Sequence, residues 1–177
     1  ATAPTENYTY TESSAASDVY KRQVLGGVLC PDHPGLTGHS DADAVCHAIT
    51  DAILGAAALG DIGRHFPPSD DRWKGADSID LLERAVALLA GQGDRVVNVD
   101  VTVICQTPKI GPRVDEMRGR LAGALRVDTD FVSVKGQTNE QLGWIGRSEG
   151  IGVHAVALIE RSSSTSRPAR ETPPAAS

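Results

Sequence analysis

The segment VVNVDVTVIC, residues 96–105, decides the fold of this chain. Valines at positions 97, 99, 101 and 103 alternate with Asn98, Asp100 and Thr102. A period of two is typical of a β-strand that has one face in the core and one polar face. We therefore expect a strand over 96–105, around which the other elements pack.

Elements of both kinds are expected before and after this strand. Apolar spacing and Gly or Pro boundaries predict a strand at 24–29, a helix from Ser40 to about Gly60, a helix at 78–90, a helix from Pro112 to about Leu125, and strands at 131–135 and 151–160. Ser40 is expected to be the N-cap of the first helix, with Asp43 as its capping-box carboxylate. The order β-α-α-β-α-β-β alternates too loosely for a doubly wound parallel sheet. We expect an α+β fold in which helices cover one face of a mixed sheet.

Charge and composition exclude several classes of partner. The 177 residues carry 17 Lys and Arg against 23 Asp and Glu, a formal net charge of −6, which argues against nucleic acid or an anionic membrane as the main partner. No apolar run approaches the roughly 18 residues that a membrane helix needs. Cys30, Cys46 and Cys105 lack the spacing of a disulfide or zinc-knuckle framework. We expect them to be small buried hydrophobic residues in a protein of a reducing compartment.

The chain is expected to hold one domain over 24–160, between two segments that lack an apolar period. All three tyrosines lie within the first twenty residues, and the string at 17–23 resembles translated sequencing adapter. We expect segment 1–23 to be disordered or foreign to the natural protein. Segment 161–177 is rich in Ser, Pro, Ala and Arg and is expected to be a disordered tail.

The densest polar cluster is the run 39–43, HSDAD, followed by His47. Asp43 and His47 are four residues apart and so share a helix face, where a His–carboxylate pair can hold a divalent metal such as zinc. His39 precedes the helix, where free backbone N–H groups favour a phosphate. The alternative is that Asp41 and Asp43 only cap the helix and that His47 is an ordinary packed or solvated side chain.

Three further segments are candidate ligand sites. A long loop after the first helix contains DIG at 61–63 and FPPSD at 66–70, with a surface loop as the alternative. The segment QTPK at 106–109 leaves the central strand, and its lysine can bind a phosphate. In the glycine-rich segment 135–147, Glu140 can hold Mg²⁺ beside phosphate oxygens, and Arg147 can bind a phosphate or form a surface pair with Glu149.

The absence of several well-known motifs reduces the number of reaction classes that the sequence could support. It has no Walker phosphate loop, no Rossmann glycine fingerprint and no nucleophile elbow. Helix ends that favour phosphate, a lysine loop and a carboxylate beside an arginine match phosphoryl transfer or metal-assisted hydrolysis. The residues by themselves lead no further than this reaction class.

Several motifs resemble, in order and spacing, those of the 2-C-methyl-D-erythritol 2,4-cyclodiphosphate synthase family. They are GHSDAD at 38–43, HAITDA at 47–52, LGAAALGDIG at 54–63, KGADS at 74–78, NVDVT at 98–102, QTPK at 106–109 and the run 138–150. The resemblance covers about residues 24–160. It implies a ferredoxin-like sandwich that assembles as a homotrimer with active sites between subunits.

The resemblance also implies a reaction in non-mevalonate isoprenoid biosynthesis. In 4-diphosphocytidyl-2-C-methyl-D-erythritol 2-phosphate, the 2-phosphate would attack the β-phosphorus, and CMP would leave. His39 and Thr138 would stabilise the transition state, His47 would bind Zn²⁺, and Glu140 would bind Mg²⁺ or Mn²⁺. The implied substrate contacts are His39, Ser40, Asp61, Ile62, Gly63, Phe66, Ser69, Asp70, Thr107, Pro108, Lys109, Gln137, Thr138, Asn139, Glu140, Trp144 and Arg147. Some members of the family are fused to the pathway cytidylyltransferase.

One departure from the family concerns zinc. The family's first strand carries an Asp-x-His pair that supplies two more zinc ligands, whereas Asp18-Val19-Tyr20 has tyrosine in the place of the histidine. Because catalytic zinc normally takes three protein ligands, we expect weak zinc binding and slow turnover from the chain as written. The alternative function is a catalytically impaired trimeric module that binds a cytidine nucleotide, and a third hypothesis is an unrelated zinc hydrolase.

Overall fold

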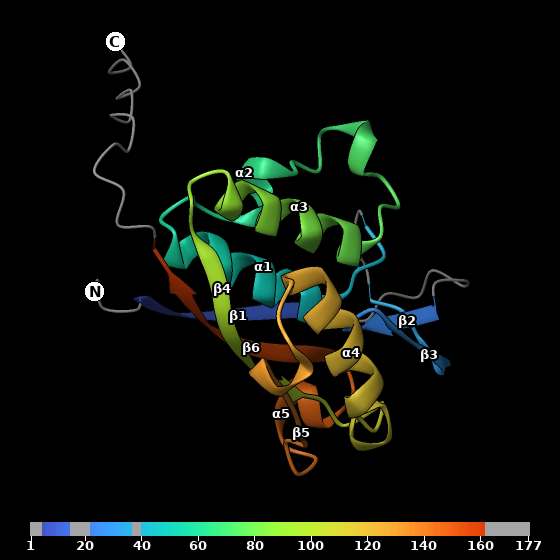
Figure 1. Cartoon of the computed structure of the whole chain (residues 1–177). Coiled ribbons are helices and arrows are strands. Elements are labelled where there is room, and N and C mark those ends of the chain that lie inside the picture. The colour runs from blue at the N-terminus through green and yellow to red at the C-terminus, as the bar shows by residue number, and fades with distance from the viewer. Residues whose placement is uncertain (1–4, 15–21, 37–39, 162–177) are drawn as a thin grey trace.

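The computed structural model describes residues 5–14, 22–36 and 40–161 of the chain (Figure 1). Its strands are β1 (Thr5–Ser14), β2 (Arg22–Leu25), β3 (Val28–Pro34), β4 (Arg95–Ile104), β5 (Val132–Gln137) and β6 (Gly150–Glu160). Its helices are α1 (Ala44–Ala56), α2 (Ile62–His65), α3 (Ser78–Ala90), α4 (Val114–Leu125) and α5 (Gly143–Gly146), with 3-10 turns η1 (Asp71–Trp73), η2 (Gly111–Arg113) and η3 (Thr129–Phe131). None of the helices in these ranges is long and apolar enough to cross a membrane.

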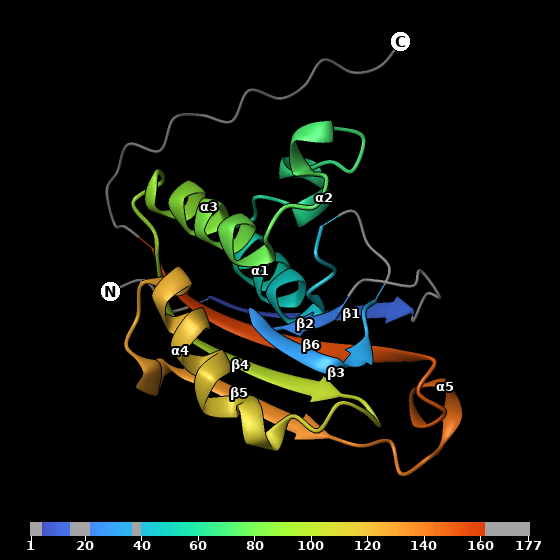
Figure 2. The ribbon, with the colours of Figure 1, turned by 90° about the vertical axis from the view of Figure 1, so that its right-hand side faces the viewer.

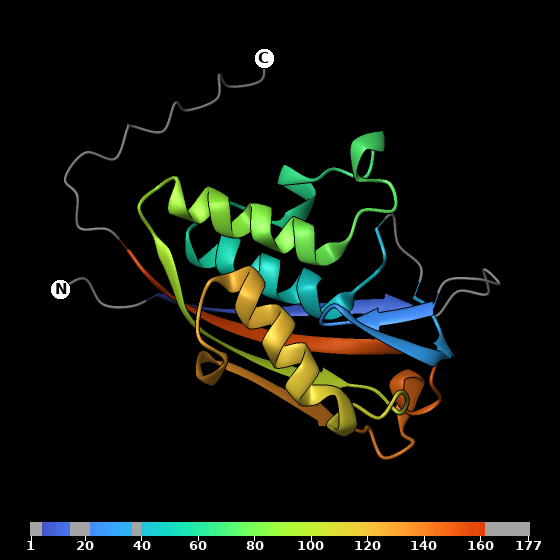
Figure 3. The same cartoon turned by 45° about the vertical axis from the view of Figure 1, so that its right-hand side comes forward.

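A four-stranded sheet in the order β1-β6-β4-β5 forms one layer of the domain. β4 and β5 run parallel, whereas β6 is antiparallel to both of its neighbours, β1 and β4. Figures 2 and 3 show α1, α3 and α4 on one face of this sheet. The predicted α+β fold, a mixed sheet with helices on one face, is therefore confirmed.

The central strand forms where the sequence predicts it, with one local correction. Val99, Val101 and Val103 are buried, as their alternation predicts. Val97 is only half-buried, because the pairing between β4 and β6 shifts register between Val96 and Asn98. This irregularity turns Val96 into the core in place of Val97.

Helix α1 is buried on nearly all sides, between the sheet and α3. The expectation that Ser40 caps this helix is wrong, because the N-cap is Asp43. Ser40 Oγ accepts a hydrogen bond from the N–H of Ala42, and Asp41 Oδ1 accepts one from the N–H of Asp43. Ala42 has a φ of 61°. These local side-chain bonds compete with helical ones, so the helix begins only after them.

The next two helices follow the predicted pattern more closely. α3 has the expected bounds and buries Leu82, Val86 and Leu89. α4 begins at Val114 because the predicted first residue, Pro112, lies in the preceding turn η2. The short helices α2 and α5 were not predicted.

The single strand expected at 24–29 is instead a hairpin. β2 ends at Leu25 and β3 begins at Val28, with Gly26 and Gly27 between them. These glycines have φ values of 58° and 73°. Two successive positive φ angles are what a two-residue type I′ hairpin turn requires.

The first strand corrects the expectation of disorder for one part of segment 1–23. Thr5–Ser14 form β1, which pairs along its whole length with β6, from Thr5 opposite Ile159 to Ser14 opposite Gly150. Without β1, this edge of β6 would leave its backbone N–H and C=O groups unpaired. The Thr- and Tyr-rich composition of 5–14 also suits a strand. Residues 15–21, with the Asp18-Val19-Tyr20 string, lie outside the described residues, as does the tail at 162–177.

The three cysteines are free and buried, as predicted. Burial raises the pKa of the thiol of Cys30 and of Cys46, and it raises the pKa of Cys105 to about 11. The thiolate is the reactive form of cysteine, so these side chains act as small core residues.

Candidate functional site

The first group of predicted site residues surrounds the start of α1. Asp41 accepts hydrogen bonds from both the backbone N–H, at 3.1 Å, and the hydroxyl of Ser78, the first residue of α3. Ser40 Oγ lies 3.4 Å from the same hydroxyl. Asp41 thus ties the segment before α1 to the start of α3, and Ser40 is held beside that junction. His39 lies outside the described residues.

Asp43 has a structural role in place of the predicted metal-binding one. Its carboxylate accepts hydrogen bonds from the backbone N–H groups of Gly26, Gly27, Val45 and Cys46, at 2.6–3.1 Å. Burial raises the pKa of Asp43, and these N–H donors partly offset the shift. The prediction that Asp43 and His47 could hold a metal together is wrong, because the Asp43 carboxylate is enclosed by the helix start and the β2–β3 turn.

His47 instead interacts with the next turn of its own helix. Its Nε2 lies 3.2 Å from Asp51 Oδ2, and Asp51 Oδ1 accepts a 2.7 Å hydrogen bond from the N–H of Ile62. Asp61 caps α2 by accepting a 2.9 Å bond from the N–H of Arg64. Asp51 therefore links His47 to the predicted substrate residues 61–63. Sequence reasoning did not assign this role to Asp51, although its spacing of four from His47 is a usable signal.

The loop at 66–70 reaches outward from α2. The Arg72 guanidinium binds both oxygens of Asp70, with Nε at 3.0 Å from Oδ1 and 2.8 Å from Oδ2. Hydrogen bonds from Arg72 lower the pKa of Asp70, so this carboxylate is ionised at neutral pH. Ser69 is exposed and Phe66 is half-buried. The loop thus carries an anchored anion, an exposed hydroxyl and a half-buried aromatic ring.

The second group lies at the carboxyl ends of the parallel strands β4 and β5. Register places Ile104 opposite Gln137, so the segments that follow both strands emerge side by side. Gln106 Oε1 accepts a 3.3 Å bond from the N–H of Gln141, which joins the two segments directly. Lys109 is exposed at this end. The predicted residues 107–109 and 137–140 are therefore brought together.

Thr138 and Glu140 form the polar centre of this second group. The Thr138 hydroxyl donates a 2.8 Å hydrogen bond to Glu140 Oε1. Asn139 Nδ2 donates to the carbonyl of Leu142 at 2.7 Å, which closes the turn before α5. Both Glu140 and Asn139 are exposed. A carboxylate and a hydroxyl are therefore presented to solvent on a closed turn.

Arg147 forms the surface pair that the sequence left open as an alternative. Its Nε and one terminal nitrogen contact the two Glu149 oxygens at 2.6 and 3.0 Å. The hydrogen bond from Arg147 lowers the pKa of Glu149. Trp144, in α5, is half-buried.

The two groups occupy different parts of one chain. In Figures 2 and 3, α2 lies on the helical side, beyond α1, whereas α5 lies past the ends of the strands, next to the ends of β4 and β5. The fold therefore assembles residues 40–63 as one group and residues 106–140 as another, and it leaves the two groups apart within a single chain.

The comparison with known proteins decides the family. The sequence signature of the YgbB family matches residues 14–160. The chain belongs to the YgbB family. A relative from Symbiobacterium thermophilum named 2-C-methyl-D-erythritol 2,4-cyclodiphosphate synthase is 59% identical over 136 residues, which are 77% of this chain and 87% of that protein.

Solved structures agree with the YgbB assignment. The bifunctional IspDF from Campylobacter jejuni matches with a TM-score of 0.84 and 34% identity, over 90% of this chain and 43% of that chain. The IspF–CDP complex from Plasmodium falciparum matches with a TM-score of 0.77 and 32% identity, over 89% of this chain and 96% of that chain. The Campylobacter chain is thus more than twice as long as the part that matches.

The family resemblance implies Zn²⁺ and Mg²⁺, and the residues present fit Mg²⁺ better than Zn²⁺. Among the residues that the structure describes, no group of three or more His, Cys, Asp or Glu side chains could hold a metal ion. His47, with Asp51 at Nε2, does not provide the three protein ligands of a catalytic zinc site. The weak zinc binding expected from the sequence stays a prediction, which metal analysis of the purified chain checks. Glu140 does fit Mg²⁺, which is often bound by one or two carboxylates together with substrate phosphates.

Proposed function

We propose that the chain converts 4-diphosphocytidyl-2-C-methyl-D-erythritol 2-phosphate into 2-C-methyl-D-erythritol 2,4-cyclodiphosphate and CMP. The observation that carries this proposal is the 59% identity over 136 residues with a synthase of that name. The two polar groups described above supply the donors and the carboxylate that such a diphosphate needs. A place in non-mevalonate isoprenoid biosynthesis follows from the same name.

The proposed reaction balances without a covalent enzyme intermediate. An oxygen of the 2-phosphate forms a bond to the β-phosphorus, and the bond from that phosphorus to the oxygen bridging to the α-phosphate breaks. The electron pair leaves with CMP, so no proton has to move. Catalysis of such a transfer consists mainly of positioning and of neutralising charge.

We assign the cytidine end of the substrate to two segments. Asp61 and Gly63 bind the ribose, and residues 107–109 with the backbone near Thr138 bind the cytosine and the α-phosphate. The hydrogen bond between Gln106 and Gln141 supports the second half of this assignment, because it fixes the loop at 106–109 to the segment that contains Thr138. The CDP named in the Plasmodium falciparum complex gives independent support for a cytidine ligand.

We assign the phosphates to residues of both groups. When the substrate binds, the Thr138 hydroxyl turns from Glu140 to donate to a phosphate oxygen, and His39 stabilises the developing charge. Mg²⁺ held by Glu140 would neutralise charge shared between the two reacting phosphates. The 2.8 Å contact between Thr138 and Glu140 supports this arrangement, because it directs both side chains to one place. Ser40, Ile62, Phe66, Ser69 and Asp70 contact the erythritol side.

We further propose a homotrimer with each active site between two subunits. The separation of the two groups within one chain supports this assembly, since one phosphate chain must reach both. The sheet face opposite the helices also supports it, because half-buried Val156 and Leu158 lie there without helical cover. Arg147 and Trp144 lie near the subunit contact in this assembly.

The cellular setting is also a proposal. The bifunctional IspDF structure supports association with a cytidylyltransferase, either as a fusion or as a separate chain. Relatives from bacteria support a bacterial cytoplasmic enzyme.

The test is ³¹P NMR of the diphosphocytidyl substrate mixed with Mg²⁺ and a stoichiometric amount of the chain, so that even one slow turnover is seen. We expect CMP and cyclic diphosphate in equal amounts. Glu140→Gln should slow the reaction about 100-fold, because the metal carboxylate is lost. CMP with an open-chain product, or CDP binding without any CMP release, would contradict the proposal, and the second result would favour a nucleotide-binding module.

A further inference from the structure

The loop that joins α1 to α3 contains a small aromatic cluster. Two of the proposed substrate residues, Phe66 and Asp70, are connected to it. Phe66 and Trp73 contact each other edge to face, with ring centroids 5.1 Å apart at 81°. Edge-to-face packing is a favoured geometry for aromatic rings. Phe66, which also packs against the hydrophobic core, is therefore positioned in part by Trp73.

Trp73 in turn contacts two arginines. The guanidinium carbons of Arg72 and Arg84 are each 5.4 Å from the centroid of the Trp73 ring. Tryptophan is the ring that attracts cations most strongly, and this distance lies within the effective range. Because Arg72 also binds both oxygens of Asp70, the anion and the aromatic ring of the substrate loop are connected through Trp73.

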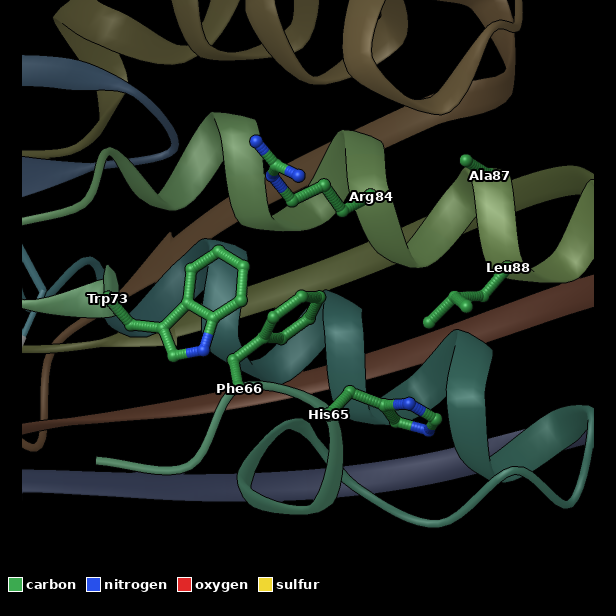
Figure 4. Close-up of a pocket in the computed structure, with 6 residues that line it drawn as sticks. All are labelled: His65, Phe66, Trp73, Arg84, Ala87 and Leu88. Atoms are coloured by element: carbon green, nitrogen blue, oxygen red, sulfur yellow. The ribbon is translucent and has the colours of Figure 1, made fainter. Parts of the chain in front are cut away.

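Arg84 is the member of this cluster that lies on a long helix, where it is exposed. It lies on α3, and Figure 4 shows its guanidinium near the indole of Trp73. Among the described residues, Arg84 makes no ion pair with a carboxylate, so its charge is available to the ring. The cluster thus connects the loop to a long helix through one cation–ring contact.

Beyond the Arg84–Trp73 contact, the loop and α3 are separated by a cavity. A cavity of about 390 Å³ lies there, lined by His65, Phe66, Trp73, Arg84, Ala87 and Leu88 (Figure 4). Leu88 remains 39% exposed, so the loop does not cover it. Apart from Phe66, which packs against the hydrophobic core, the loop is therefore attached to α3 through the Arg84–Trp73 contact.

We propose that Arg84 is a positioning residue for the substrate. Through Trp73 it fixes Phe66 and Asp70 where they meet the erythritol end of the ligand, an inference that rests on the proposed function. Arg84 itself does not touch the substrate, and it acts by limiting the motion of the loop. Its loss should therefore weaken substrate binding while leaving the reacting phosphates correctly aligned.

The experiment compares Arg84→Gln, Arg84→Lys and the control Arg120→Gln. Arg120 is an exposed helical arginine that is paired with Glu116 on α4, away from the loop. For Arg84→Gln we expect KM about 2–5-fold higher, kcat unchanged, and about 2–5-fold faster deuterium uptake in residues 66–77. Arg84→Lys should be intermediate because it keeps the charge but loses the planar group. The control should match the wild type in all three quantities.

Two outcomes would overturn the proposal. One is an Arg84→Gln variant with unchanged deuterium uptake, because the contact would then not hold the loop. The other is faster uptake with unchanged KM, because the loop would then not position substrate. If the wild type itself releases no CMP, the proposed function fails, and deuterium uptake alone decides whether Arg84 holds the loop.

Discussion

Replacing Asp43 with alanine is expected to lower the free energy of unfolding by about 3–5 kcal/mol. The Asp43 carboxylate is 1% exposed and accepts hydrogen bonds from four backbone N–H groups. Alanine would leave those donors buried without partners, two in the β2–β3 turn and two at the start of α1. Denaturant unfolding followed by circular dichroism measures the change.

Asp77 provides the matched control for this substitution. It is also the N-cap of a thirteen-residue helix, but it is exposed and its side chain accepts from the N–H of Ile79. Asp77→Ala should cost about 0.5–2 kcal/mol, the usual value for an N-cap. Asp43→Asn should recover part of the loss, because its amide oxygen still accepts while its NH₂ group cannot. Equal losses for Asp43→Ala and Asp77→Ala would contradict the account of the buried carboxylate.

Gly146→Ala is expected to reduce kcat/KM about 100-fold, the scale of loss that a displacement of about 1 Å can cause. A Cβ at this position would lie 2.2 Å from the carbonyl carbon and 2.6 Å from the Cα of Gln141. Those are backbone atoms and cannot rotate away, so the turn that follows β5 must shift. That turn carries Thr138 and Glu140, which the proposed function places on the phosphates.

The control for Gly146→Ala is Gly119→Ala in α4. An added Cβ there meets nothing within 4 Å, and alanine favours a helix, so stability should rise by about 0.5–1 kcal/mol with unchanged activity. Steady-state CMP release and thermal unfolding are measured for both variants. Wild-type kcat/KM in Gly146→Ala would show that the exact position of this turn does not matter.

The parts of the fold that the sequence predicts are those with strong local patterns. The stripe of α3 and the alternation of β4 each depend on the residues of one element. β1 was missed because its strand state depends on the open edge of β6, which is distant in sequence. The hairpin was missed because two glycines interrupt what otherwise looks like one short apolar strand.

In the candidate site too, contacts between residues close in sequence could be predicted, and contacts between distant residues could not. Thr138 and Glu140 are two residues apart, and their proximity could be inferred from the sequence. The role of Asp43 could not, because its partners Gly26 and Gly27 lie 17 and 16 residues away on a hairpin that was read as one strand. The contact between Trp73 and Arg84 joins a turn to a helix, and no sequence motif predicts it.

The most direct test of the proposed active site between subunits is complementation between two impaired variants. Asp61→Ala removes a residue of the first group, and Glu140→Gln removes one of the second. Each variant alone should lose about 10–100-fold in CMP release, the scale of a lost hydrogen bond to a charged group. Co-expressed, they form mixed oligomers in which some sites receive both intact groups from two different chains. We predict that the mixture regains about one quarter of the wild-type activity, as random pairing of subunits in a cyclic assembly requires. A mixture no more active than the two variants measured separately would contradict an active site shared between neighbouring chains.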